Sequence, residues 1–177
     1  MKDNHKDIYR SEEYILQAMK KWSTTVFVLA LAQTTSRVDA EDIHQEVFIR
    51  LLKSTISFND DEHLKAWLLR VTINCCHDFA KSSWQSKVTA IEDFETFASE
   101  SDTQSFEAMS DLAQALRKLP FEMRAIVHLY YFEEYTSEEI AQLMELNPST
   151  VRTRLERARK QLKTLLGGEK NGSYKYL

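Results

Sequence analysis

The sequence predicts an all-α protein, and two observations support this prediction. First, the 177-residue chain contains only three Gly and two Pro. A β-sandwich or a doubly wound sheet needs many more residues that reverse the chain or adopt positive φ. Second, apolar residues recur at three- and four-residue spacing, which is the period of an amphipathic helix. The length suits one medium domain or two small ones.

The charges are segregated along the chain. The formal net charge of −4 would ordinarily argue against a nucleic-acid partner. However, the stretch from Arg152 to Lys163 has six basic residues against Glu156, a local charge of 6 − 1 = +5. The stretch from Thr89 to Asp111 has no Lys or Arg and seven acidic residues, which are Glu92, Asp93, Glu95, Glu100, Asp102, Glu107 and Asp111. The local charges are therefore more informative than the total.

Two helix-rich blocks, 12–87 and 106–166, flank a polar middle segment. That segment is acidic, rich in Ser and Thr and poor in aliphatic residues, so it cannot bury enough surface to offset the entropy lost on ordering. We therefore expect a domain over 1–87, a flexible linker over 88–105, a second domain over 106–168 and a tail over 169–177.

The first block contains a predicted helix that starts at Asp39 as N-cap. Ile43, Val47 and Leu51 recur at four-residue spacing and define its buried stripe, together with Phe48 and Leu52. The opposite face carries Asp42, Gln45, Glu46, Ile49 and Arg50.

A loop over 54–61 precedes a second predicted helix, which starts at about Glu62. Its expected core residues are Leu64, Trp67, Leu68, Val71, Cys75 and Phe79. Trp67 is assigned to the core because large aromatic side chains mostly supply buried area. The other face carries Lys65, Arg70, Asn74, His77, Asp78 and Lys81.

The second block starts with a short amphipathic helix containing Leu112, Leu116 and Leu119 and ended by Pro120. An apolar stretch, 123–132, follows it. A helix over 137–144 is then predicted, with Thr136 or Ser137 as cap and Glu139 or Glu138 at the capping-box spacing.

The last predicted helix covers 149–165, with Ser149 as N-cap and Gly167 and Gly168 at its end. Its expected buried residues are Val151, Leu155, Ala158, Leu162 and Leu165.

The helices over 137–144 and 149–165 fit a helix-turn-helix, in which the second helix enters the DNA major groove. Its outward stripe offers bidentate donors and a hydroxyl for base edges, and comprises Arg152, Thr153, Glu156, Arg157 and Lys160. Residues suited to phosphate contacts flank it, namely Thr150, Arg154, Arg159 and Lys163, and Ser149 is a further candidate for contact with the −35 element. A merely solvated face would mix charges of both signs, whereas Glu156 is the one acidic residue among seven charges here. DNA binding is therefore the favoured interpretation.

Three segments together resemble the extracytoplasmic-function class of the sigma-70 family of bacterial sigma factors. Residues 39–53, DAEDIHQEVFIRLLK, are similar to region 2.2 of that class, and 66–81, AWLLRVTINCCHDFAK, to its following promoter-reading segment. Residues 119–162, from LPFEMRAIVHLYYFEEYTSEEIAQLM to STVRTRLERARKQL, are similar to region 4. The matches occur in the family's order and cover about 12–87 and 106–166.

The resemblance implies the partners and further site residues. The face with Asp42, Gln45, Glu46, Ile49 and Arg50 would dock on the clamp helices of the RNA polymerase large subunit, and the polymerase flap would be a second contact. The resemblance also implies that −10 promoter DNA is melted and read by Ser57, Phe58, Asn59, Lys65, Arg70, Asn74, His77, Asp78 and Lys81. An anti-sigma factor is a candidate partner, because this family is often held inactive by one.

The sequence departs from the family pattern at three places. The run over 81–87 lacks the usual arginines, which predicts a weaker electrostatic grip on the −10 duplex. Glu145 replaces the Gly that is common in the turn of region 4. Glu156 lies on the reading face, where a carboxylate would accept a hydrogen bond from cytosine N4 or repel phosphate.

The sequence can also be compared with two other functional classes, a stand-alone regulator and an enzyme. A stand-alone helix-turn-helix regulator, with the first block as a sensor or dimerisation domain, remains the alternative. An enzyme is disfavoured, because His44-Gln45-Glu46 lacks the PCxxC of zinc deaminases and Cys76 and His77 point about 100° apart on a helix. We expect no metal and no cofactor, with Cys75 and Cys76 as buried reduced thiols.

The sequence also predicts a cytoplasmic protein without membrane insertion. Its most apolar stretch, 26–32, is far shorter than the roughly 18–20 residues that span a bilayer, and the N-terminus lacks the apolar core of a signal peptide.

Overall fold

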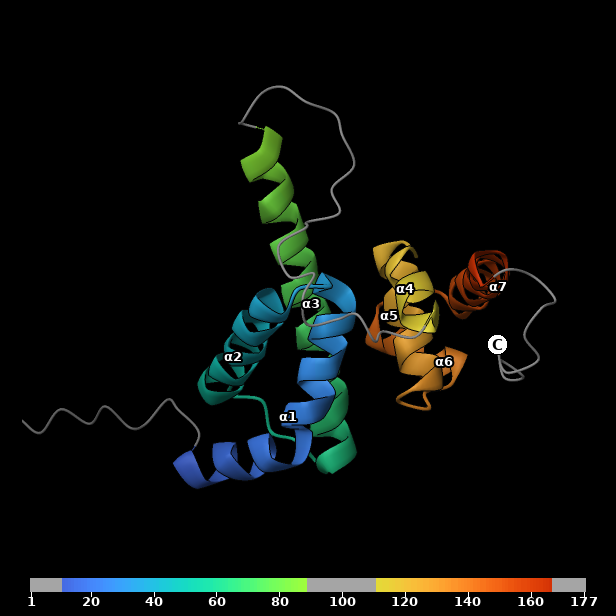
Figure 1. Ribbon diagram of the computed structural model, residues 1–177. Coiled ribbons are helices and arrows are strands. Elements are labelled where there is room, and N and C mark those ends of the chain that lie inside the picture. The colour runs from blue at the N-terminus through green and yellow to red at the C-terminus, as the bar shows by residue number, and fades with distance from the viewer. Residues whose placement is uncertain (1–10, 89–110, 167–177) are drawn as a thin grey trace, which may run out of the picture. The chain divides into compact units, whose positions relative to one another are not determined.

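The computed structural model describes residues 11–88 and 111–166, with side chains placed for 11–81 and 111–166. Every regular element in these ranges is a helix, so the predicted all-α class is confirmed. The chain divides into two compact units, residues 1–80 and 81–177 (Figure 1). The predicted acidic linker from residue 89 onward, the expected Gly167–Gly168 helix end and the tail 169–177 lie outside the described residues.

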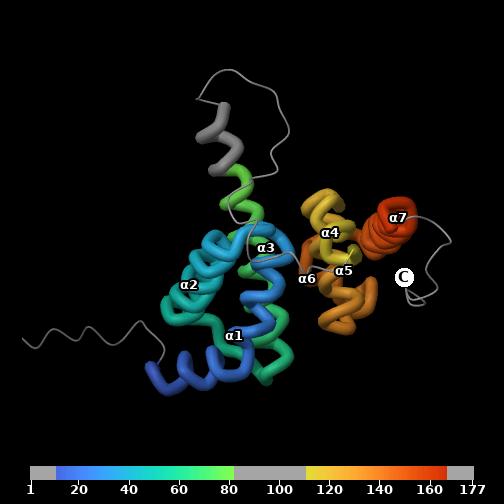
Figure 2. Tube along the Cα trace, in the orientation of Figure 1, coloured from blue at the N-terminus to red at the C-terminus, as the bar shows by residue number. Residues whose placement is uncertain are grey.

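The first unit is built on α1 (Glu12–Thr34), α2 (Arg37–Lys53) and α3, which begins at Asp61 and ends at Val88. α1 and α2 lie along each other (Figure 2). Val26 and Leu29 of α1, Val47 and Leu51 of α2 and Leu69 of α3 are all fully buried. Full burial of each such side chain stabilises the fold by about 1.5–3 kcal/mol. The predicted core stripe is confirmed at Ile43, Val47, Phe48 and Leu51, whereas Leu52 is half-buried.

The predicted start of α2 is wrong by three residues. The N-cap is Ser36, whose side chain accepts a hydrogen bond from the Asp39 backbone N–H at 3.3 Å. Asp39 instead lies in the first turn, where a carboxylate suits the positive end of the helix dipole. Both residues favour a helix N-terminus, and local sequence does not decide between a cap and a first-turn position.

Two aromatic predictions on α3 also need correction. Phe79 was expected in the core but is 38% exposed, because residues 77–81 are all exposed and the helical spacing continues there without a core to face. Trp67 is half-buried and makes an edge contact with Phe58, with ring centroids 5.5 Å apart. Leu64, Leu68, Val71 and Cys75 are buried as predicted.

The second unit contains α4 (Asp111–Arg117), α5 (Phe121–Tyr131), α6 (Ser137–Leu143) and α7 (Pro148–Leu165). α7 contacts each of the other three helices. Its buried residues are Val151, Leu155, Ala158 and Leu162, as predicted, whereas Leu165 in the last turn is 37% exposed. The core of this unit is completed by Ile126 and Leu129 of α5 and Ile140 of α6.

The caps of α6 and α7 fix where the two helices begin. Thr136 and Glu139 form a full capping box at the start of α6, which confirms one of the two predicted pairings. α7 is capped by Asn147 rather than by the predicted Ser149. The reason is Pro148: its fixed φ and missing N–H suit the first helical position, so the cap must precede it.

Candidate nucleic-acid interface

α6 and α7 pack as a helix-turn-helix. Ile140 and Ala141 of α6 and Val151 and Leu155 of α7 are all buried, and the small Ala141 allows a close approach of the two helices. The turn between them has Glu145 in the left-handed region at φ 55°. The Leu146 N–H donates to the Ala141 carbonyl at 2.8 Å, and the Glu145 N–H donates to the Gln142 carbonyl at 3.4 Å. This is the Schellman arrangement, whose left-handed residue is usually Gly.

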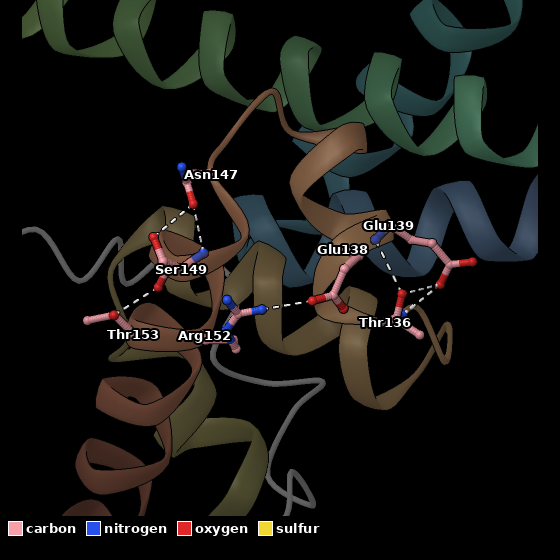
Figure 3. Close-up of polar contacts among 7 residues, drawn as sticks. All are labelled: Thr136, Glu138, Glu139, Asn147, Ser149, Arg152 and Thr153. Atoms are coloured by element: carbon pink, nitrogen blue, oxygen red, sulfur yellow. Dashed lines mark hydrogen bonds and ion pairs between the residues drawn. The ribbon is translucent and has the colours of Figure 1, made fainter.

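The predicted outward stripe of α7 is exposed at all five positions, Arg152, Thr153, Glu156, Arg157 and Lys160. Two of its cations already contact carboxylates. Arg152 Nη1 lies 2.7 Å from Glu138 Oε1 of α6 (Figure 3). Lys160 Nζ lies 2.7 Å from Glu156 Oε1, and the hydrogen bond from Lys160 lowers the pKa of Glu156.

The hydroxyl groups near the start of α7 bond within the helix. Ser149 Oγ donates to Asn147 Oδ1 at 2.8 Å, and Thr153 Oγ1 donates to the Ser149 carbonyl at 2.9 Å (Figure 3). Both side chains are exposed. Each oxygen can still accept a hydrogen bond, so both can contact DNA as acceptors.

The residues predicted to contact phosphates differ in their surroundings. Lys163 is exposed and Thr150 is half-buried. Arg154 pairs with Glu122 of α5 at 2.6 Å, and Arg159 Nε donates to the Tyr131 hydroxyl at 2.7 Å. The hydrogen bond to Tyr131 raises the pKa of Arg159 above its ordinary value. Arg154 and Arg159 therefore hold α7 against α5, whereas Lys163 extends from the unit.

In the first unit, the polar face predicted for α3 includes Asn74, His77, Asp78 and Lys81, all exposed. Their three- and four-residue spacing places them on one side of the helix. Arg70 is half-buried, and half-buried Lys65 has its Nζ 5.7 Å from the centroid of the Trp22 ring.

The preceding loop is partly packed against α3. Ser57 and Asn59 are exposed, whereas Phe58 is half-buried between His63 and Trp67, with ring centroids at 5.3 and 5.5 Å. The Asn59 backbone N–H donates to His63 Nδ1 at 3.4 Å. Ser57 and Asn59 are thus exposed on either side of Phe58, which packs against His63 and Trp67.

The predicted polar face of α2 is a continuous surface. Asp42, Gln45 and Ile49 are exposed, and Ile49 retains 42% of its accessible surface. Glu46 Oε1 lies 2.7 Å from Arg50 Nε, and this hydrogen bond raises the pKa of Arg50. The face therefore has an apolar centre with a charged pair beside it.

Comparison with known proteins decides the family. Residues 19–86 match sigma-70 region 2, and residues 109–162 match sigma-70 region 4. The chain is 32% identical over 141 residues to the RNA polymerase sigma factor SigV of Bacillus subtilis strain 168, covering 80% of this chain and 84% of that protein. The chain belongs to the extracytoplasmic-function class of sigma-70 family sigma factors.

Further relatives agree with this assignment. The sigma factor is 31% identical over 139 residues to the ECF RNA polymerase sigma factor SigM of Mycobacterium tuberculosis H37Rv, covering 77% of this chain and 70% of that protein. Its fold is similar to that of the sigma factor RpoE, solved with the anti-sigma factor NepR from Bartonella quintana. That comparison gives a TM-score of 0.69 at 20% identity, covering 87% of this chain and 97% of RpoE.

A second solved fold is CnrH in complex with the cytosolic domain of CnrY, with a TM-score of 0.62 at 20% identity and 88% and 89% coverage of the two chains. Region 2 followed by region 4 supports a sigma factor that directs polymerase to promoters, and does not support the alternative of a stand-alone regulator. Sigma factors are generally non-enzymatic.

The sequence alone did not predict the exposure of Val38 on α2 or the contact of Glu138 with Arg152. Val38, 61% exposed, lies four residues before Asp42 and extends the same face of α2. Val38 fits the three- and four-residue spacing of this face, but it lies before Asp39, the predicted start of the helix. Glu138 contacts Arg152 from a different helix, fourteen residues away. No periodic pattern in the sequence signals that contact.

Cys75 and Cys76 are buried and not in a disulfide, as predicted, and burial raises the pKa of Cys75. Within 11–88 and 111–166, no cluster of three or more His, Cys, Asp or Glu side chains could hold a metal ion. None of the helices in these ranges is long and apolar enough to cross a bilayer.

Proposed function

We propose that this sigma factor divides promoter recognition between its two helical units, with region 4 reading the −35 element and region 2 docking on polymerase and opening the −10 element. The observation that carries this proposal is the exposed five-residue stripe on the second helix of a helix-turn-helix, in a segment with a local charge of +5. A basic recognition helix with base-reading donors is the physical requirement for such readout.

In region 4, Arg152 and Arg157 supply guanidinium forks for guanine, and Thr153 supplies a hydroxyl. Glu156 accepts from cytosine N4 or disfavours other bases. Lys163 and Thr150 contact phosphates, which fix position without reading sequence. Lys160 completes the base-reading stripe, and Ser149 contacts the −35 element at the helix start. Arg154 and Arg159 support α7 from inside the unit, since both bond to α5.

In region 2, the α2 face of Asp42, Gln45, Glu46, Ile49 and Arg50 docks on the clamp helices of the polymerase large subunit. The exposed Val38 adds an apolar contact to this face. Ser57, Phe58 and Asn59, with the polar face of α3, hold the melted −10 strand. An extruded base needs a pocket, with its neighbours stacked on aromatics and its backbone held by cations.

Several wider features belong to the same proposal. Region 4 also contacts the polymerase flap, and an anti-sigma factor covers one or both units when the protein is inactive. RpoE, whose fold is similar, was solved in complex with the anti-sigma factor NepR. The protein works in the cytoplasm, where core polymerase is found, and performs no catalysis of its own.

Run-off transcription with core polymerase on genomic fragments tests this function and yields both promoter elements at once. Transcripts are expected only when the protein is added, and their mapped starts should share −35 and −10 sequences. Tight binding of the protein alone to promoter duplex, without co-elution with core polymerase, would contradict the proposal.

A further inference from the structure

Glu138 in α6 and Arg152 in α7 are joined by an ion pair that links the two helices of the helix-turn-helix. Arg152 Nη1 lies 2.7 Å from Glu138 Oε1, and both side chains are more than half exposed, at 57% and 62% (Figure 3). The pair is therefore on the surface, beside the stripe proposed to read DNA. Neither the family matches nor the reading-face pattern assigns a role to Glu138.

Both ends of this pair are attached to well-fixed backbone. Glu138 lies in the first turn of α6, directly before Glu139, whose carboxylate accepts from the Thr136 backbone N–H at 2.8 Å in the capping box. Arg152 lies in the first turns of α7, whose start is fixed by the Asn147 cap. The residues near the N-terminus of a recognition helix are the ones that reach base edges.

The contact restrains a long side chain while leaving most of its donors available. A guanidinium has five N–H donors in a rigid planar fork, and Glu138 engages Nη1. An unrestrained Arg loses rotamer freedom when it binds, so a side chain already held in place has less freedom to lose. We propose that Glu138 is a positioning residue that orients Arg152 for base reading; this rests on the proposed function of α7.

The Glu138 carboxylate should also weaken non-specific binding to DNA, although it favours base reading by Arg152. It places a negative charge close to the DNA phosphates and neutralises part of the charge of Arg152. Loss of the carboxylate should therefore strengthen binding to non-promoter DNA while weakening base discrimination by Arg152. A residue with a purely structural role would lower both together.

The test uses holoenzyme assembled from core polymerase and the full chain. First, the −35 position read by Arg152 is identified as the one whose base preference is lost in Arg152→Ala. The Glu138→Gln variant is then expected to lower discrimination at that position about two- to fivefold, the range of an exposed ion pair. Discrimination at the other −35 positions should stay as in the wild type, and binding to non-promoter duplex should increase.

Two further variants separate the outcomes. In the Arg152→Ala background, Glu138→Gln should no longer change base discrimination. The control Glu41→Gln removes a comparable exposed carboxylate, paired with Arg37 at 2.9 Å in region 2, and should leave −35 discrimination unchanged. The inference about Glu138 is wrong if Glu138→Gln retains wild-type base discrimination, or if it lowers discrimination equally with and without Arg152. Neither result would contradict the proposed reading face. Unchanged preference at every −35 position in Arg152→Ala would overturn the proposed reading face itself.

Discussion

The arginines of α7 show how one residue type takes different roles on one helix. Arg152 and Arg157 are exposed, whereas Arg154 and Arg159 are half-buried. Arg159 donates to Tyr131 at 2.7 Å, and its guanidinium carbon lies 5.4 Å from the Tyr130 ring centroid. A charge held this way contributes to folding through its hydrogen bond and its ring contact. We propose that the exposed arginines, Arg152 and Arg157, serve in DNA binding instead.

Removal of the Tyr131 hydroxyl should lower the free energy of unfolding of α4–α7. Hydrogen bonds to charged groups contribute about 1.5–3 kcal/mol, and the partial exposure of this one places Tyr131→Phe near the lower end. Circular dichroism of the full chain during urea unfolding measures the loss. The three tryptophans lie in α1 and α3, so a transition absent from tryptophan fluorescence belongs to α4–α7.

Arg159→Lys is the companion variant, since it retains the charge but lacks the planar fork. It should also destabilise α4–α7 and leave −35 base preference intact. A stable Arg159→Lys protein with altered preference would show that Arg159 reads DNA rather than supporting the helix.

His44 gives a prediction for pH. Its Nε2 lies 2.7 Å from Ser23 Oγ, and its ring lies near Phe48 and Phe27, with centroids at 5.0 and 6.3 Å. Burial lowers the pKa of His44 below its ordinary 6.5. Below that pH the unfolded chain therefore binds a proton more readily than the folded chain. The contribution of His44 to stability is complete above pH 6.5 and falls as the pH drops below it.

The measurement is the free energy of unfolding at about pH 7.5 and about pH 5.5, followed by tryptophan fluorescence. His44→Gln should make the first unit's stability less dependent on pH across this interval. Identical pH dependence in wild type and His44→Gln would exclude this role.

At the scale of elements, the helix-turn-helix depends on how its helices begin and end. A capping box starts α6, a Schellman turn ends it, and Asn147 with Pro148 starts α7. Each device satisfies backbone groups that helix ends leave unpaired. The direction of the recognition helix is thus set within a short stretch of sequence.

Substitution of the α7 cap should distinguish Asn147 from Ser149. Asn147→Ala removes the acceptor of the Ser149 backbone N–H, 2.9 Å away, and should cost about 1 kcal/mol, the usual value for a lost N-cap. Ser149→Ala keeps that bond and should cost less. Urea unfolding of both variants, followed by circular dichroism, makes the comparison, and a larger cost for Ser149→Ala would contradict the assigned cap.

Relief of the turn at Glu145 should stabilise the protein. A left-handed L-residue costs roughly 1–2 kcal/mol, partly offset by the extra unfolded-state entropy of Gly, so Glu145→Gly should gain about 0.5–1 kcal/mol. The control Gln142→Gly, in the last turn of α6, should lose up to about 1 kcal/mol because Gly disfavours helical backbone. A shift in the midpoint of thermal unfolding reports both changes. Destabilisation by Glu145→Gly would mean that the Glu side chain contributes more than the strain costs.

At the scale of the whole molecule, two units with different surfaces share one chain. The net charge of −4 combines a +5 segment on α7 with seven acidic residues between Thr89 and Asp111. Non-specific attraction to DNA follows local positive charge and is weakened by salt. The charge distribution therefore favours contact through α7 and disfavours contact through the acidic segment.

Holoenzyme binding to promoter fragments at several salt concentrations tests this division. Arg157→Ala should cost about 1–3 kcal/mol and relax preference at one −35 position. Lys163→Ala should weaken binding to all sequences alike and reduce the salt slope by about 1. Equal and sequence-independent losses in both variants would refute the distinction between reading and phosphate-contacting residues.

Much of the molecule could be predicted from local sequence. The helices, the buried stripe of α7 and the capping box depend on periodicity and on neighbours a few residues apart. The exposure of Asn74, His77 and Asp78 on one face of α3 follows from the same spacing, whereas their proposed role at the −10 element comes from the family resemblance. Errors arose where two residues could serve one local role, as with Ser36 and Asp39 or with Asn147 and Ser149.

The sequence by itself determined the all-α class, the helix-turn-helix and the sigma-factor family, because each is encoded in short-range spacing and in motif order. Tertiary structure alone decided which arginines of α7 face inward, that Phe79 leaves the core, and that Glu138 lies beside Arg152. These outcomes depend on which side chains meet across helices. Contacts between Arg159 and Tyr131, or between Arg152 and Glu138, join residues 28 and 14 positions apart, a separation that no helical period specifies.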